Sequence, residues 1–139
     1  MHPARPPRIL LVEDSPLDAE LLELELREAG LHADMLRIDQ LSRVPEALAG
    51  FRPDVVISDW RLPGFSGLEV LHLVREHAPG VPFVLLCGVY EEDSNTRQVL
   101  AGANLVLRKD AMEEAAPALR TLLAPDPDAV VADDASSDA

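Results

Sequence analysis

The chain has little cysteine and few basic residues, and each shortage excludes a class of protein. Its single cysteine, Cys87, excludes an internal disulfide and is typical of a protein kept in a reducing compartment. Lysine and arginine together number 12, against 25 aspartate and glutamate residues, which gives a net charge of −13. Nucleic-acid and anionic-membrane surfaces need clustered basic side chains, so this balance argues against both as partners.

Long apolar runs are also missing. No stretch approaches the roughly 18 apolar residues that span a bilayer, and residues 1–7 are rich in proline without the apolar region of a signal peptide. We therefore expect a cytoplasmic protein with no membrane partner. A length of 139 residues suits one folded domain, which we place at residues 8–124. Residues 1–7 and the acidic tail 125–139 are expected to be disordered.

Short apolar runs alternate with longer segments of helical period, which is typical of an α/β protein with a parallel sheet. The run at 32–38 is the least apolar and is expected to be an edge strand. The predicted strands are 8–13, 32–38, 54–59, 82–87 and 104–108.

The expected helices are marked by caps and prolines. Ser15 caps the first, with Pro16 at its first position and Asp18 at the capping-box position. Leu17, Leu21 and Leu24 lie on one face of this helix. A proline is tolerated only in the first turn of a helix, so we expect the last helix to begin at Pro117, after a short turn. The other helices are predicted near 42–51, after the Ser66 cap, and near 93–101.

Charged residues follow three of the predicted strands. The first strand ends in Glu13 and Asp14, the third in Asp59, and the fifth in Lys109. In five strands wound 2-1-3-4-5 with helices on both faces, ligands gather where the strand order reverses, between the first and third strands. Three crowded carboxylates repel one another unless a cation intervenes, and oxygen ligands of this kind suit Mg²⁺.

Lys109 is the only lysine in a chain with eleven arginines, which makes a chance placement at a strand end improbable. A metal on one flank and an ammonium group on the other form a clamp for a transferring phosphoryl group. Asp59 is then the natural nucleophile, forming an aspartyl phosphate.

At residues 8–124 the chain resembles the receiver domain of two-component response regulators, of the subgroup with Lys-Asp where most receivers have Lys-Pro. Each matching piece is weak alone, but their order and spacing make them specific together. The matching pieces are Leu11-Val12-Glu13-Asp14-Ser15-Pro16, the segment from Ser58 to Leu71, the strand from Val81 to Leu86, Gly102-Ala103, and Leu107-Arg108-Lys109.

The resemblance implies a flavodoxin-like fold, with Asp59 as phosphoacceptor and Lys109 in contact with the phosphate. It implies Mg²⁺ held by Glu13, Asp14, Asp59 and the main-chain carbonyl of Arg61. The donor would be a sensor histidine kinase or a histidine phosphotransfer protein. A homodimer through the face of the fourth helix, fifth strand and last helix is also implied. Such a domain signals by protein contact and is not an enzyme beyond its own phosphorylation and dephosphorylation.

Two positions depart from the family pattern. Cys87 stands where receivers usually carry the switch Thr or Ser, and Val106 stands where they carry an aromatic residue. A thiol is a weak hydrogen-bond donor, so a scaffold that binds its partner regardless of phosphate is an alternative.

A metal-dependent phosphohydrolase is a second alternative. Such enzymes need an acid two residues after the nucleophile, where this chain has Arg61. The loop aromatics Trp60 and Phe65 are open to two interpretations, as partner contacts or as core residues.

Overall fold

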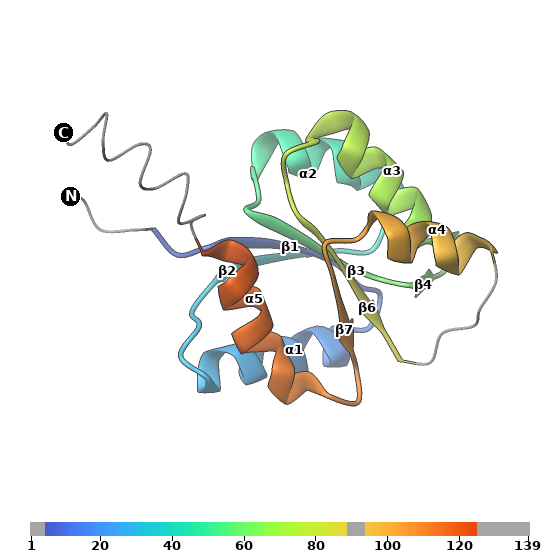
Figure 1. Cartoon of the computed structure of the whole chain (residues 1–139). Coiled ribbons are helices and arrows are strands. Elements are labelled where there is room, and N and C mark those ends of the chain that lie inside the picture. Colours follow the sequence, from blue (N-terminus) through green and yellow to red (C-terminus); the bar gives the residue numbers. More distant parts are fainter. Residues whose placement is uncertain (1–4, 89–93, 125–139) are drawn as a thin grey trace, which may run out of the picture.

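A computed structural model of the chain describes residues 5–88 and 94–124. Five parallel strands form one sheet in the order β2-β1-β3-β6-β7, which is the predicted winding once two short hairpin strands are left out of the count (Figure 1). Every predicted strand is confirmed to within two residues at each end. The strands are β1 (Arg8–Val12), β2 (Asp34–Ile38), β3 (Val55–Asp59), β6 (Phe83–Cys87) and β7 (Leu105–Arg108).

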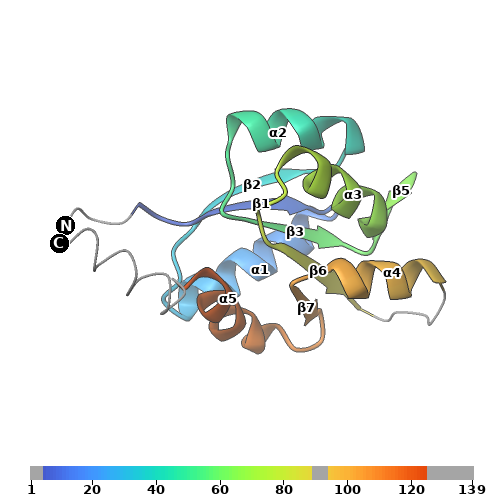
Figure 2. The same ribbon diagram turned by 45° about the horizontal axis from the view of Figure 1, so that its top comes forward.

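Helices cover both faces of this sheet, as Figure 2 shows from a second direction. On one face lie α2 (Val44–Gly50), which follows the 3-10 turn η1 (Leu41–Arg43), α3 (Gly67–His77) and α4 (Ser94–Gly102). On the other lie α1 (Pro16–Glu28) and α5 (Ala115–Leu123), the latter preceded by the 3-10 turn η2 (Met112–Glu114). Each layer has its own apolar cluster because successive side chains of a strand point to opposite faces.

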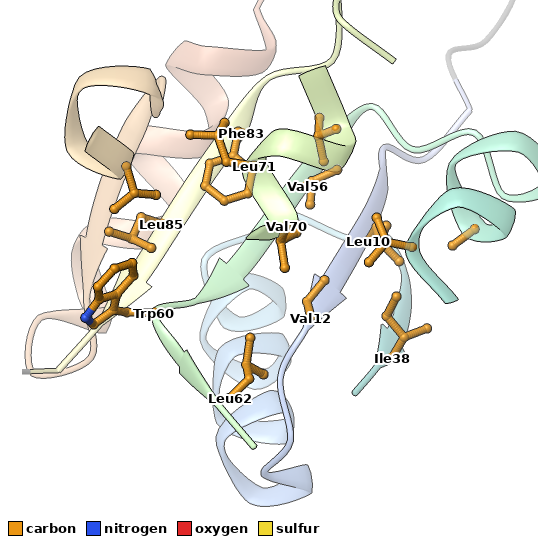
Figure 3. Packing of buried hydrophobic residues seen from close by; sticks show 14 of the residues in the cluster. Leu10, Val12, Ile38, Val56, Trp60, Leu62, Val70, Leu71, Phe83 and Leu85 are labelled. Carbon is orange, nitrogen blue, oxygen red and sulfur yellow. The ribbon is translucent and has the colours of Figure 1, made fainter. Parts of the chain in front are cut away.

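The central strands are buried on both faces, which explains why their sequences are nearly continuous apolar runs. Leu10, Val56 and Phe83 pack toward α2 and α3, whereas Ile9 and Ile57 pack toward α1 and α5. Figure 3 shows the first of these clusters, with the indole of Trp60 at its margin. Each fully buried large apolar side chain stabilises the fold by about 1.5–3 kcal/mol relative to exposure.

Two local features differ from what the sequence predicts. The segment after Asp59 forms a hairpin that the sequence did not predict, with β4 (Arg61–Leu62) antiparallel to β5 (Phe65–Ser66) and Gly64 at a φ of 85° in the turn. The last helix begins at Ala115, two residues before Pro117. The proline is tolerated there because the first N–H groups of a helix have no intrahelical acceptor to lose.

The apolar face of α1 that the sequence emphasised is not the buried one. Leu17, Leu21 and Leu24 do share a face, but they are 63%, 51% and 46% exposed. The helix instead buries its face of Ala19, Leu22 and Leu26 against the sheet and α5. The small side chain of Ala19 allows a close approach between the helix and the strands.

Residues before β1 contact the sheet and its loops. The guanidinium of Arg5 makes two hydrogen bonds of 2.9 Å to Asp54, and the carbonyl of Pro7 accepts from the amide of Asp34. Residues 1–4 and the predicted acidic tail lie outside the described residues. Within the described ranges, no helix combines the length and hydrophobicity that crossing a bilayer requires.

Candidate functional site

The carboxyl ends of β1 and β3 bring three acidic residues together. Val12 pairs with Ser58, so the residues that follow each of them lie side by side where the two strands end. One carboxylate oxygen from each of Glu13, Asp14 and Asp59 lies within 4.8 Å of the other two. The predicted convergence of these three residues is therefore observed.

Lys109 reaches the same place from the end of β7. Its backbone amide donates to the carbonyl of Cys87 at 2.9 Å, which fixes the residue beside the end of β6. Its Nζ lies 3.1 Å from Oδ2 of Asp59 and 3.3 Å from Oε1 of Glu13. The only ammonium side chain of the protein thus faces the acidic cluster directly.

Glu13 is the most deeply buried member of the cluster, with 1% of its surface exposed. Its Oε2 accepts from the Ser15 amide at 3.1 Å, whereas Oε1 has no hydrogen-bond partner among the described residues. The 3.3 Å contact of Oε1 with Lys109 is an ion pair without hydrogen-bond geometry. Burial, and then the neighbouring charge of Asp59, raise the pKa of Glu13 to about 7.

The environment of Lys109 strongly favours its charged form. Burial alone would lower the pKa of the ammonium, but the hydrogen bond to Asp18 and the charge of Asp59 outweigh that effect and raise it. Three carboxylates, those of Glu13, Asp18 and Asp59, contact the ammonium, and Asp14 lies beside two of them, so acidic groups outnumber the one cation at this edge. The buried Oε1 of Glu13, which lacks a hydrogen-bond partner among the described residues, and the surrounding carboxylates together suit a small divalent cation with oxygen ligands.

Asp18 belongs to the site although the sequence assigned it only to helix capping. Its amide does donate to Ser15 Oγ at 3.1 Å, which is the expected cap. Its carboxylate, however, accepts from Lys109 Nζ at 3.0 Å, the shortest contact that the ammonium makes. The available signal was its place in the first turn of α1, at the same edge of the sheet as Asp14.

The loop after Asp59 orients this carboxylate and closes the cluster from the α3 side. Asp59 Oδ1 accepts from the amide of Trp60 at 2.8 Å. A Cβ at Gly67 would lie 3.0 Å from the Asp59 carbonyl, so this close approach favours glycine. Trp60 is buried in the core, which supports the core interpretation for it, and Arg61 begins β4 two residues after Asp59.

Cys87 ends β6 and is 1% exposed within the cluster beneath α3. Burial raises the pKa of its thiol, so the group is a neutral apolar side chain. Val106 is partly buried against the same cluster. Neither residue contributes a charged or hydroxyl group to the site.

Comparison with known proteins agrees with this geometry. The family model of the response regulator receiver domain matches residues 9–133. A probable transcriptional regulatory protein, TcrX of Mycobacterium tuberculosis, is 34% identical over 120 residues, covering 86% of this chain and 50% of that protein. The phosphate regulon transcriptional regulatory protein PhoB of Rhizobium meliloti is 34% identical over 102 residues, covering 70% of this chain and 43% of PhoB.

Solved structures give the same fold. A putative response regulator from Chloroflexus aurantiacus superposes with a TM-score of 0.74 at 29% identity, covering 87% of this chain and all of that one. The signal receiver domain of an HD domain-containing protein from Pseudomonas fluorescens has a TM-score of 0.75 at 24% identity, covering 86% of this chain and 95% of that one.

The chain spans half the length or less of these curated relatives. Since their names describe transcriptional regulators, the absence of a nucleic-acid partner is not confirmed and stays a prediction. The family takes phosphoryl groups from histidine kinases onto an aspartate, and its members are generally signalling domains rather than catalysts. With a family model matched along most of its length, the chain belongs to the response regulator receiver domains.

Proposed function

We propose that this protein accepts a phosphoryl group on Asp59 from a phosphohistidine and signals by protein contact. In this transfer the phosphorus–nitrogen bond of the donor breaks and a phosphorus–oxygen bond forms at the Asp59 carboxylate. The observation that carries the proposal is the contact of 3.1 Å between Asp59 and the ammonium of Lys109, within the acidic cluster. Lys109 would bind an oxygen of the incoming phosphoryl group and so neutralise part of its charge.

The carboxylates of Glu13, Asp14 and Asp59, with the carbonyl of Arg61, are the proposed ligands of Mg²⁺. Bound there, the ion would supply positive charge for the phosphoryl oxygens. The orphaned Oε1 of Glu13 supports this assignment, because a buried carboxylate oxygen needs a partner.

Asp18 is proposed to set the position of Lys109 before phosphorylation. The ammonium is shared between Asp18 at 3.0 Å and Asp59 at 3.1 Å, so a phosphoryl group on Asp59 must compete with Asp18 for it. The Asp18 side chain is 39% exposed, which leaves its carboxylate free to be solvated when Lys109 turns to the phosphate.

The proposed donor is a sensor histidine kinase or a histidine phosphotransfer protein in the cytoplasm. The phosphohistidine would approach along the edge that carries Asp14, which is exposed. The exposed Leu21 lines the same small hollow as Asp18 and Lys109, which offers an apolar contact next to the acceptor. A homodimer through α4, β7 and α5 remains a proposal from the family resemblance.

A scaffold that works without phosphate is the second candidate, and Cys87 supports it. The thiol is buried and neutral, so the hydroxyl hydrogen bond that receivers usually make to the phosphate is absent from this position. A titration of the partner with and without beryllofluoride separates the two functions. Equal affinity in both conditions favours the scaffold.

Phosphorylation with a small phosphodonor, followed by Phos-tag electrophoresis, tests the main proposal. The wild-type chain should give a shifted band in Mg²⁺ and none in EDTA. Asp59→Asn should give no shifted band, whereas the matched control Asp39→Asn, at an exposed carboxylate near β2, should behave as wild type. A shifted band in Asp59→Asn of the same intensity as wild type would contradict the assignment of the acceptor.

A further inference from the structure

A hollow of about 540 Å³ lies at the opposite edge of the sheet from Asp59, where the strands begin. It is lined by arginines 5, 8 and 52, together with Leu48, Pro53 and Val81. Arg8 is the first residue of β1, and Pro53 lies two residues before β3. We call this feature the arginine hollow. It has no part in the phosphoryl chemistry proposed above.

The lining of the arginine hollow is basic. Asp54 is the carboxylate that its arginines contact: Arg5 makes two hydrogen bonds of 2.9 Å to it, and the amide of Arg8 donates to it at 2.8 Å. Burial would raise the pKa of Asp54, but the Arg5 hydrogen bond outweighs this and holds the pKa below its ordinary value. Among the lining residues and the acid that they contact, three guanidinium groups face one carboxylate.

Arg52 supplies the least satisfied of these charges. Within residues 5–88 and 94–124, no hydrogen bond or ion pair of its guanidinium is found. Its backbone has a φ of 56°, in the left-handed region, within the short connection between α2 and β3. Arg52 lines the hollow together with two further arginines, and such a group of guanidinium side chains suits a ligand with several carboxylates or another multiply charged anion.

The chain contains such a ligand in its own acidic tail. Residues 125–139 contain five aspartates and no basic residue. The described chain ends after α5, and α5 runs antiparallel to the strands, so its end lies at the edge where the strands begin. Figures 1 and 2 both show the end of α5 and the first described residues on the same side of the molecule.

The tail is long enough to reach. Fifteen residues extend up to about 50 Å, whereas a domain of this size has a radius of gyration of about 14 Å. We propose that residues 125–139 bind intramolecularly across the arginine hollow, with their aspartates paired to Arg52 and its neighbours. Binding of this kind is weakened by salt, because exposed ion pairs are screened.

Paramagnetic relaxation enhancement in the full 139-residue chain tests this proposal. A nitroxide is attached at position 137 of the variant Ser137→Cys. The native Cys87 is 1% exposed and should not react with the label. The chain without the substitution, treated with the same reagent, is the control for labelling. The amides of Arg52, Gly80 and Val81 should broaden at low salt. The broadening should disappear at about 0.5 M NaCl, where the Debye length is below about 5 Å. It should also disappear when the five tail aspartates are changed to asparagine.

Two further measurements separate the proposal from its rivals. Arg52→Gln should reduce the broadening at Val81, whereas the matched control Arg43→Gln, at the start of α2, should leave it unchanged. Equal broadening with the all-asparagine tail, or none in any condition, overturns the proposal. Broadening seen only when labelled and isotope-enriched molecules are separate chains also overturns it, because the tail of a second copy then occupies the hollow.

Discussion

Replacing Glu13 with glutamine tests whether the acidic edge is a cation site that costs folding stability when no cation is present. Glutamine keeps the size of the side chain, and its carbonyl oxygen can still accept from the Ser15 amide, as Glu13 Oε2 does at 3.1 Å. What the substitution removes is the buried negative charge beside Asp59. The variant therefore isolates the electrostatic cost of that charge.

The size and direction of the effect follow from the raised pKa. The pKa of Glu13 is about 7 in the folded protein, against an ordinary value of 4.5, so the folded state binds this proton more tightly than the unfolded chain does. The stability that the protonated group contributes is complete below about pH 4.5 and is lost as the pH rises through about 7. The difference corresponds to about 3 kcal/mol.

The measurement is urea unfolding in EDTA at several pH values, followed by far-UV circular dichroism and by the fluorescence of Trp60, the only tryptophan. We expect Glu13→Gln to be more stable than wild type by about 3 kcal/mol at pH 8 and to lose this advantage near pH 4.5. Mg²⁺ at about 1,000 times its dissociation constant should reverse the order, because ligand at that excess stabilises the wild type by about 4.1 kcal/mol.

Comparison with the variant removes the contribution of other groups that titrate in both proteins. Parallel stability curves for wild type and Glu13→Gln from pH 4.5 to 8 would refute the reasoning, since the buried charge would then carry no cost. Failure of Mg²⁺ to stabilise the wild type more than the variant would separately refute Glu13 as a ligand.

Three further predictions concern single side chains. Asp18→Asn removes a carboxylate that competes for Lys109, so phosphorylation by a small donor should be faster by about 2–5-fold, with a stability change below about 1 kcal/mol. Phos-tag time courses measure the rate and urea unfolding measures the stability. A slower reaction contradicts the competition. Phe83→Ala should destabilise by about 3–5 kcal/mol in urea unfolding, because the ring is fully buried; a loss below about 1 kcal/mol contradicts the packing. Asn104→Ala removes the oxygen that accepts from the Phe83 amide at 2.8 Å, while Arg75 keeps its hydrogen bonds to the carbonyls of Val81 and Gly102. The unpaired Phe83 amide should cost about 1–3 kcal/mol and exchange its hydrogen faster; unchanged exchange contradicts this role.

The sheet could be predicted from the sequence because its central strands are buried on both faces. Burial on both faces makes the runs at Ile9, Val55 and Phe83 continuously apolar, and such runs alternate visibly with polar helical segments. The acidic cluster followed from the same pattern, since parallel strands deliver their last residues to one edge. No side-chain geometry was needed to expect Asp59 beside Glu13.

The helices were harder to predict because their positions depend on tertiary packing. α1 has two apolar stripes, and only contact with the sheet decides that Leu22 is buried while Leu21 is exposed. A proline at the first helical position predicts that α5 begins at Pro117, two residues late, because the first turn of a helix has several positions where a proline costs little.

Asp18 shows a different limit of sequence reasoning. Its two roles use different atoms: the amide completes the cap of α1 at Ser15, and the carboxylate binds Lys109, which lies 91 positions away in the sequence. The capping pattern around Ser15 is local and by itself explains an acidic residue at position 18, so the sequence gives no indication that Asp18 has a second partner. The partner follows only from the fold, because the first turn of α1 and the end of β7 meet at the edge that holds Asp59. Any acidic side chain in the first turn of α1 that faces this edge therefore competes for the ammonium on which the phosphoryl chemistry depends.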